Sequence, residues 1–393
     1  MKILMILPRV PFPQRDGGAI AMQQMIKGLK NAGADLILFF LNTSKHFVKP
    51  EIIRDQFDSY GEVLYSDINN DVTVSGALLN LGSKKSYHIS RFEDETAKKK
   101  LQELVVNRDI DIVHFDGLQT TVFLSLIRQH TSAKCVLRQH NIEHLIWERN
   151  AQYANGIKGM YLEILANRLK KYEEKTLKEV DAIIPISKVD AVYFNDFDKP
   201  VHVTSTGIDV EEECPSDFSR YKVFHLGSLD WLPNQEGIKW FLDTVWPCVY
   251  LSDSRYEFYI AGRNMSDQFR SYCEGIKNVI VVGEVEDSKN FMKNHGVLVV
   301  PLKSGSGVRI KILEGLSLGI PIVTTAIGVE GIEVEHKKEL FIADTEKEFQ
   351  NSIITITTQS QDIQDNAKRF IRDNFDNNVI SQKLLRFYDR IGI

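Results

Sequence analysis

The sequence of 393 residues has few cysteines and no long apolar run. Its cysteines are scattered and form no C-x-x-C pair: Cys135, Cys214, Cys248 and Cys273. This spacing argues against a disulfide framework and a structural zinc site, and it fits a reducing compartment. No stretch approaches the roughly 18 apolar residues that a membrane-spanning helix needs. The apolar run at residues 3–7 is too short for a signal peptide, so we expect a cytoplasmic protein.

The sequence also lacks a strong charge excess. Lys and Arg number 48 against 53 Asp and Glu, a formal net charge of −5, which argues against a general nucleic-acid-binding protein. Hydrophobic residues make up 43% and charged residues 26%, an ordinary globular balance. At roughly 100–200 residues per domain, the length predicts two or three domains. Low-complexity tracts and short-period repeats are absent.

Short apolar runs alternate with helix-like segments in both halves of the chain. This alternation is typical of parallel sheets wrapped by helices. In the first half we predict strands at residues 2–7, 35–41, 63–65, 110–115, 135–138 and 182–186. In the second half we predict strands at residues 223–226, 256–261, 279–282, 297–301 and 321–324. We also predict a long helix over 158–180 and a helical tail over 362–390.

The predicted fold class is therefore α/β, with two Rossmann-like domains. Ligands of open parallel sheets bind outside the carboxyl ends of the strands. Two such sheets facing each other would form a central cleft, and we expect the functional residues to line it.

Residues 301–321 carry the strongest motif, a strand that runs through a glycine-rich turn into a helix. The small residues Gly305, Ser306 and Gly307 would let a ligand approach the backbone. Free N–H groups at the start of the helix suit a phosphate. An ordinary surface helix with a glycine-rich start is the alternative.

Two cations follow this turn, Arg309 and Lys311. Placed at a diphosphate leaving group, they would stabilise the negative charge that builds up as its bond breaks. Glu314 lies about one turn deeper, where a carboxylate can accept hydrogen bonds from ribose hydroxyls. These residues predict a site for a nucleoside diphosphate.

The stretch Gly305–Glu314 resembles the donor-binding segment of glycosyltransferase family 4, the retaining group 1 transferases of GT-B architecture. The resemblance implies that Arg309 and Lys311 hold the donor diphosphate and that Glu314 holds the ribose. Many members carry a further glutamate eight positions earlier, where this sequence has Ser306. The donor sugar is therefore left open, and Ser306 and Gly307 are assigned to donor binding.

The resemblance also implies the arrangement of the chain and its co-substrate. We expect an N-terminal acceptor-binding domain at residues 1–205, a nucleotide-sugar-binding domain at 206–375, and a C-terminal helix at 376–393 that crosses back to the N-terminal domain. A nucleoside-diphosphate sugar would be the co-substrate, with UDP favoured over GDP, and no other cofactor is implied.

Segments before this motif resemble the same family in the same order. Residues 223–247 resemble the start of its C-terminal domain, where Gly227 and Ser228 would bring backbone N–H groups to the phosphates. The loop at Val285 resembles the one whose backbone contacts the nucleotide base. Trp231, Trp240 and Trp246 are predicted to be core residues.

In the N-terminal half, Gly17 and Gly18 resemble the family's paired-glycine loop, which faces the donor phosphates. His140 ends a predicted strand and resembles the histidine that contacts the donor sugar, since a neutral imidazole can donate or accept a hydrogen bond. A histidine satisfied by local backbone is the alternative. Asp116 and Glu143 are candidate acceptor-binding residues, and His114 and Asp116 together end the strand that precedes the one before His140.

Two D-x-D matches, Asp109–Asp111 and Asp196–Asp198, raise the question of a metal. Such short matches are common by chance, and Arg309 with Lys311 can neutralise the same charge, so we expect no metal. Residues 158–178 are rich in Lys and Arg and would suit contact with the inner face of a membrane. Interspersed glutamates make a solvated helix face the simpler interpretation.

The predicted function is a metal-independent glycosyltransferase that moves a sugar from a nucleoside-diphosphate sugar to a hydroxyl of a glycan or lipid-linked acceptor, with retention. The resemblance places it in cell-surface polysaccharide or glycoconjugate assembly. A nucleotide-sugar epimerase of the same architecture is one alternative. An NAD-dependent oxidoreductase is a weaker one, because the first turn is not G-x-G-x-x-G. A carbohydrate-binding protein without turnover is the third.

Overall fold

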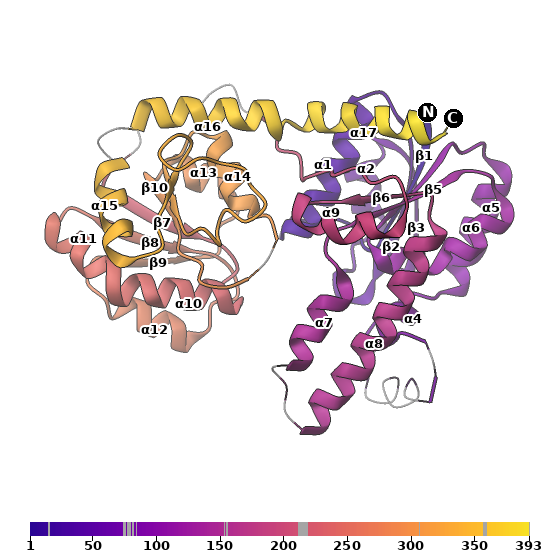
Figure 1. Cartoon of the computed structure of the whole chain (residues 1–393), viewed down its shortest axis with the longest axis horizontal. Helices are drawn as coiled ribbons and strands as arrows, with labels where there is room; N and C mark the ends of the chain where they lie inside the picture. The colour runs from indigo at the N-terminus through magenta and orange to yellow at the C-terminus, as the bar shows by residue number, and fades with distance from the viewer. Residues whose placement is uncertain are drawn as a thin grey trace. The chain divides into compact units, whose positions relative to one another are not determined.

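The computed structural model describes residues 1–14, 16–73, 76, 80, 82–83, 85–152, 154, 156–210, 219–305, 307–356 and 360–392. The chain divides into two compact units (Figure 1). The N-terminal unit comprises Met1–Gly207 together with Asn378–Ile393, and the second unit comprises Ile208–Asn377. Ser306 and Cys214 lie outside the described residues.

The N-terminal unit is built on a six-stranded parallel sheet. Its order β3-β2-β1-β4-β5-β6 is that of a doubly wound Rossmann sheet. The strands are β1 (Lys2–Leu7), β2 (Asp35–Thr43), β3 (Gly61–Ile68), β4 (Ile112–Asp116), β5 (Lys134–Gln139) and β6 (Ala182–Pro185).

The second unit repeats this topology in a second six-stranded parallel sheet, with the order β12-β11-β10-β7-β8-β9. Counted from β7, the strand order is again that of a Rossmann sheet. The strands are β7 (Lys222–Leu226), β8 (Glu257–Ala261), β9 (Val279–Gly283), β10 (Val297–Val300), β11 (Ile322–Thr324) and β12 (Phe341–Ile342). The two-residue strand β12 was not predicted, because it is too short to show periodicity.

Helices connect the strands in both units. In the N-terminal unit they are α1 (Gly17–Asn31), α2 (Pro50–Phe57), α4 (Tyr87–Ser90), α5 (Glu95–Asn107), α6 (Leu124–His130), α7 (Glu143–Gln152), α8 (Gly156–Glu179) and α9 (Lys188–Phe194). In the second unit they are α10 (Leu232–Trp240), α11 (Trp246–Ser252), α12 (Asp267–Glu274), α13 (Ser288–Lys293), α14 (Ile310–Ser317), α15 (Glu346–Ile356) and α16 (Ser360–Asn374). The helices α7 and α8 run side by side away from the sheet (Figure 1).

Each sheet is buried on both faces. In β1, Leu4 and Ile6 enter one hydrophobic cluster, whereas Ile3 and Met5 enter the cluster on the opposite face. Successive side chains of a strand point to opposite faces, so a strand covered on both sides reads as a continuous apolar run. This is why the first strand was visible in the sequence.

The chain end returns to the N-terminal unit through α17 (Asn377–Gly392). Leu384, Phe387 and Tyr388 pack in the same core as β1. The prediction of two Rossmann-like units with a returning C-terminal helix is confirmed. The prediction of a continuous helical tail is wrong, because Phe375 and Asn377 exchange backbone hydrogen bonds with Ile208 and so interrupt the helix. Within the described residues, no helix combines the length and apolar character needed to cross a membrane.

Candidate active site

The glycine-rich turn of the second unit leads from β10 into α14. Gly305 and Gly307 have φ angles of 105° and 90°, in the left-handed region that favours glycine. Arg309 then takes an extended conformation as the residue before the first helical position. The backbone therefore turns sharply just before α14, and this helix begins directly after the turn.

The Arg309 side chain folds back over this turn and is only 6% exposed. Its Nη1 donates a hydrogen bond to the Gly307 carbonyl, and its guanidinium lies 5.6 Å from the centre of the Trp231 ring. Trp231 is 37% exposed, so its predicted place in the core is wrong, whereas Trp246 is buried as predicted. A side chain at Gly305 would lie within 2.9 Å of the Trp231 ring, which explains the glycine there.

Lys311, on the first turn of α14, points toward the carboxyl end of β7. Its Nζ lies 3.2 Å from Nε2 of His225 and 3.1 Å from Oδ1 of Asn234. A Cβ atom at Gly227 would stand 2.6 Å from this Nζ, so the glycine leaves room for the ammonium group. Burial and the nearby Arg309 cation lower the pKa of Lys311 to about 7.

The other predicted donor residues described in the structure lie on β7, β9 and α14 or directly after them. Ser228 donates its hydroxyl proton to Asp230 over 2.6 Å. Val285 follows β9 and is partly buried against the core that includes α14. Glu314 lies one turn further along α14, and burial raises its pKa to about 7. The structure thus brings Gly227, Gly307, Arg309 and Lys311 together at the start of α14.

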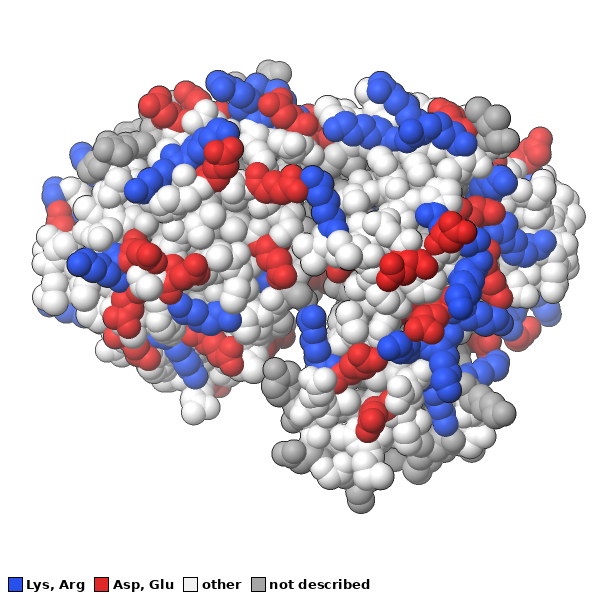
Figure 2. Space-filling model, in the orientation of Figure 1, with Lys and Arg blue, Asp and Glu red and all other residues white. Residues whose placement is uncertain are grey.

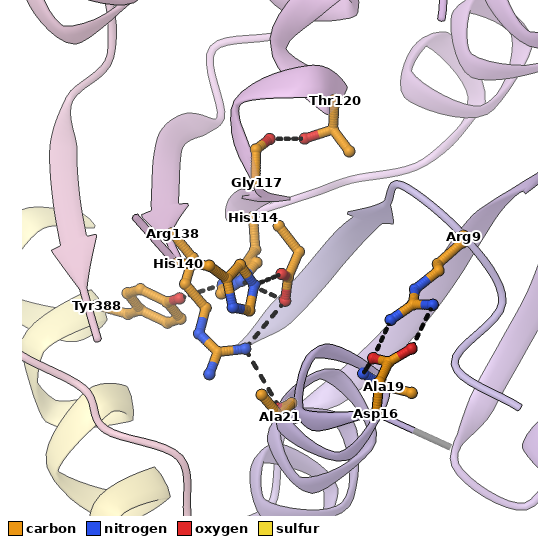
Figure 3. Close-up of polar contacts among 11 residues, drawn as sticks. Arg9, Asp16, Ala19, Ala21, His114, Gly117, Thr120, Arg138, His140 and Tyr388 are labelled. Carbon is orange, nitrogen blue, oxygen red and sulfur yellow. Dashed lines mark hydrogen bonds and ion pairs between the residues drawn. The ribbon is translucent and has the colours of Figure 1, made fainter. Parts of the chain in front are cut away.

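In the N-terminal unit, Asp116 ends β4 and contacts residues at the carboxyl end of β5, where Figure 3 shows Arg138 and His140. Its carboxylate accepts hydrogen bonds from Nη1 of Arg138 at 3.1 Å and from Nε2 of His140 at 2.5 Å. Arg138 also donates to the Ala21 carbonyl of α1 at 3.3 Å. Arg138 therefore links the buried carboxylate at the end of β4 to α1, and His140 contacts the same carboxylate.

The charge of Asp116 is fixed by these neighbours. Burial alone would raise its pKa, but Arg138 and His140 outweigh burial and hold the pKa well below its usual value. An ionised carboxylate only accepts, so Nε2 of His140 carries the proton in this contact. His140 is thereby held in one orientation at the strand end, with 20% of its side chain exposed.

The acceptor role predicted for Asp116 requires a carboxylate that an acceptor can reach. The Asp116 side chain is 0% exposed, and Arg138 and His140 occupy its two oxygens. The geometry therefore favours a role in positioning His140.

The polar chain continues from Asp116 to the C-terminal helix. His114 is fully buried, with its Nε2 3.7 Å from the Asp116 carboxylate and its Nδ1 2.5 Å from the Tyr388 hydroxyl. Burial lowers the pKa of His114, so this imidazole is neutral near pH 7. Figure 3 shows Tyr388 reaching His114 from α17.

The paired glycines form the first turn of α1. Asp16 caps the helix by accepting a hydrogen bond from the Ala19 backbone at 2.9 Å, and it also pairs with Arg9 (Figure 3). A side chain at Gly18 would lie 3.1 Å from the Arg9 guanidinium. Gly17 and Gly18 thus lie in the first turn of a capped helix, and a side chain at Gly18 would crowd Arg9.

Glu143 belongs to a second polar cluster, at the start of α7. Its carboxylate lies 3.9 Å from Nε2 of His88, and burial together with the Glu173 carboxylate raises the pKa of Glu143 to about 7. Glu173 is fully buried on α8 and accepts hydrogen bonds from the backbone N–H groups of Glu143 and His144. It caps α7 as well as pairing with the His144 ring at 2.7 Å.

The D-x-D matches do not gather ligands for a metal. Asp111 accepts a 2.6 Å hydrogen bond from the Lys2 backbone, and Asp198 has a left-handed φ of 52° at the end of a short turn. Across the part of the chain that the structure describes, no group of three or more His, Cys, Asp or Glu side chains is arranged to hold a metal ion.

Sequence reasoning missed several residues of these sites: Arg138, His225, Asn234, Glu173 and Tyr388. A signal existed for two of them. Arg138 and His225 are polar residues inside otherwise apolar strands, and a polar group buried in a sheet needs a partner. The identity of each partner could not be read from the sequence.

Comparison with known proteins agrees with this arrangement. A family model described as Glycosyltransferase Family 4 matches residues 15–212, and one described as Glycosyl transferases group 1 matches residues 220–359. Sucrose-phosphate synthase from Thermosynechococcus elongatus has a similar structure over 100% of this chain and 99% of its own, with 13% identity and a TM-score of 0.71. Anabaena HepE in complex with UDP is similar over 99% of this chain and 100% of its own, with 15% identity and a TM-score of 0.66.

A sequence relative is an uncharacterised 44.6 kDa protein in the cps region of Klebsiella pneumoniae. It is 23% identical over 98% of this chain and 99% of its own length. The two Rossmann-like units, together with the family models that match both of them, define a glycosyltransferase of the GT-B class. The chain belongs to glycosyltransferase family 4. Neither the epimerase nor the oxidoreductase alternative has support among these matches.

Proposed function

We propose that this glycosyltransferase moves a sugar from a nucleoside-diphosphate donor, with UDP favoured over GDP, to a hydroxyl of a glycan or lipid-linked acceptor, with retention at the anomeric carbon. The observation that carries the proposal is the pair of cations at the start of α14. Lys311 approaches the space left by Gly227, and Arg309 folds over the glycine turn. Similar structures include one with UDP and glucose and one with UDP and GlcNAc.

In the proposed reaction, the bond between the anomeric carbon and the donor phosphate oxygen breaks while the acceptor hydroxyl oxygen bonds to the same carbon. The departing phosphate oxygen takes the proton of the acceptor hydroxyl. Arg309 and Lys311 stabilise the charge that develops on the diphosphate. His140, oriented by Asp116, hydrogen-bonds the donor sugar. Retention rests on the family resemblance.

The remaining residues receive roles in binding. We assign Glu314 to the ribose, Val285 to the base, and Glu143 to the acceptor. The backbone groups at helix starts and turns are assigned to the donor: Gly17, Gly18, Gly227, Ser228, Ser306 and Gly307. The reaction is proposed to be independent of metal, since Arg309 and Lys311 supply the positive charge that a metal would bring. We place it at the inner face of the membrane, in cell-surface glycan assembly.

The phosphate role predicts that Arg309→Ala and Lys311→Ala each lower kcat/KM for the donor by about 100-fold, or ~2.7 kcal/mol of transition-state stabilisation. The measurement is initial-rate kinetics with the nucleotide sugar that binds best in a thermal-shift panel, repeated in EDTA. Lys303→Ala is the matched control, because this exposed lysine of the same loop donates to the Asp344 carbonyl.

Unchanged turnover in both alanine variants would disprove the proposed diphosphate-binding role of Arg309 and Lys311. Loss of activity in EDTA that magnesium restores would disprove independence of metal. Donor conversion in the absence of any acceptor would favour the epimerase alternative.

A further inference from the structure

We propose that His225 is a positioning residue for Lys311: its neutral imidazole holds the lysine, without a counter-charge, at the place where the donor diphosphate binds. Donor binding then supplies the missing negative charge, and the lysine takes up a proton as the donor binds. This inference rests on the proposed diphosphate role of Lys311.

The tautomer of His225 is fixed by the sheet. His225 is fully buried in β7, and its Nδ1 lies 2.9 Å from the Val299 carbonyl of the neighbouring strand β10. A carbonyl oxygen only accepts, so Nδ1 must carry the proton. Burial, reinforced by the Lys311 cation, holds the pKa of His225 well below its usual value, so Nε2 has no proton. The lone pair of Nε2 therefore accepts from Lys311.

Asn234 is fixed in the same way. Its Nδ2 donates to the Ser228 carbonyl at 2.8 Å, which turns its Oδ1 toward the Lys311 ammonium at 3.1 Å. The lysine thus has two acceptors from different elements, β7 and α10, and both are uncharged. Each acceptor is oriented by a backbone carbonyl that cannot reverse its role.

The charges around Lys311 leave it without compensation. Among the described residues, the recorded contacts of its Nζ are with His225 and Asn234 and include no carboxylate, and the charged group that affects it is the Arg309 cation. The titratable group in contact with it is His225, which stays neutral. A pKa near 7 means that much of the free enzyme at pH 8 has a neutral lysine, whereas a bound diphosphate favours the ammonium form.

The first experiment measures proton uptake by the unmodified protein. Calorimetric titration with UDP at pH 8, in buffers of different ionisation enthalpy, gives the number of protons taken up per nucleotide. The terminal phosphate, with a second pKa of about 6, is already ionised there. We expect an uptake approaching one proton, and an uptake near zero in Lys311→Met if that variant still binds.

The second experiment compares two substitutions of His225. His225→Gln can keep both hydrogen bonds, because its amide donates to Val299 and its oxygen accepts from Lys311. His225→Phe keeps neither. We expect His225→Phe to raise the KM for the donor about 10-fold at pH 8 and less at pH 6.5, with a smaller change in kcat, and His225→Gln to stay within about 3-fold of the unmodified protein.

His295→Phe is the matched control. His295 is also buried in this unit, and its Nδ1 also lies against a backbone carbonyl, that of Phe291, at 2.7 Å. It does not contact Lys311, so its loss should lower the melting temperature without changing the donor KM or its pH dependence. Should His225→Phe fail to fold, the proton count and His225→Gln still decide the question.

The outcomes separate the two proposals. Full donor affinity and turnover in Lys311→Met would overturn the diphosphate site itself. Two other results would overturn only the role of His225, provided that Lys311→Met has lost donor affinity or turnover. The first is zero proton uptake by the unmodified protein. The second is that His225→Phe and His225→Gln have the same kinetics.

Discussion

His140 and Lys311 are two side chains of the proposed chemistry. Each is hydrogen-bonded to a second side chain, and a further hydrogen bond fixes that second side chain. Asp116 orients His140 and is fixed by Arg138, and His225 orients Lys311 and is fixed by the Val299 carbonyl. A group constrained in this way loses little conformational freedom when substrate arrives. Each unit thus contains one side chain, His140 or Lys311, whose orientation is fixed before substrate binds.

Glu143 provides a test of burial at this scale. Its raised folded-state pKa means that the folded protein binds the proton more tightly than the unfolded chain does. Its contribution to stability is present below pH 4.5 and is lost as the pH rises through about 7. At pH 8 the folded protein bears the cost of a buried, ionised Glu143 carboxylate, and Glu143→Gln removes that charge. We therefore expect Glu143→Gln to be more stable than the unmodified protein at pH 8 by on the order of 2 kcal/mol, or about 5 °C in melting temperature.

Thermal denaturation of Glu143→Gln at pH 5 and pH 8 checks this expectation. The gain should be confined to the higher pH. Glu148→Gln serves as the control, because Glu148 lies on the same helix and is 34% exposed beside Lys170. Equal gains at both pH values, or in both variants, would contradict the explanation.

At the scale of secondary-structure elements, α17 contributes a side chain to the polar contacts around Asp116 in the N-terminal unit. This helix follows the second unit in sequence and packs in the core of the first. Its Tyr388 hydroxyl reaches His114, which lies next to Asp116. The final helix therefore takes part in the buried polar chain below His140.

Tyr388→Phe deletes the hydroxyl and leaves His114 Nδ1 without its partner. An unsatisfied buried polar group costs about 1–3 kcal/mol, so we expect the melting temperature to fall by several degrees. We also expect kcat to fall by less than about 10-fold, because Asp116 keeps its contacts with Arg138 and His140.

Denaturation and initial rates measure these two effects. Tyr60→Phe is the control: Tyr60 is a partly buried tyrosine of the same unit that packs against the same core. If Tyr388→Phe had the same melting temperature as Tyr60→Phe, the hydrogen bond to His114 would not contribute to stability.

At the scale of the whole molecule, surface charge bears on the proposed membrane contact. Figure 2 shows acidic and basic side chains intermixed on the face drawn, with a run of Lys and Arg on the N-terminal unit. On α8 the spacing of Met160, Ile164, Lys171, Lys175 and Lys178 places them in one stripe of the helix. All five are exposed, so this stripe is apolar at its start and basic toward its end.

We expect the protein to bind vesicles that contain anionic lipid and not to bind neutral vesicles. Each lysine near an anionic surface contributes about 1 kcal/mol to the binding free energy. Sedimentation with vesicles at several salt concentrations measures the binding. A triple change, Lys171→Glu with Lys175→Glu and Lys178→Glu, should abolish it.

The control substitutes three lysines elsewhere on the same unit, Lys45, Lys49 and Lys99. Equal loss in both triple variants would point to net charge instead of the α8 stripe. Absence of binding to anionic vesicles at low salt would contradict the membrane contact.

Much of the fold was visible in the sequence, for a physical reason. Strands covered on both faces read as apolar runs, as in β1 and β10, and turns that need a left-handed φ show their glycines, as at Gly305 and Gly307. The break between α16 and α17 was missed because Ile208, far away in the sequence, makes the competing hydrogen bonds. The exposure of Trp231 was missed because an aromatic residue is usually assigned to the core.

The sequence by itself determined where most of the strands and helices form and which loop carries the two cations, since these depend mainly on residues close together in the chain. The tertiary structure alone decided which groups hold the reactive side chains. His225 lies 86 positions from Lys311, and Tyr388 lies 274 positions from His114. Hydrogen bonds and desolvation act through space, so only the folded chain assigns these partners and sets the pKa values that follow from them.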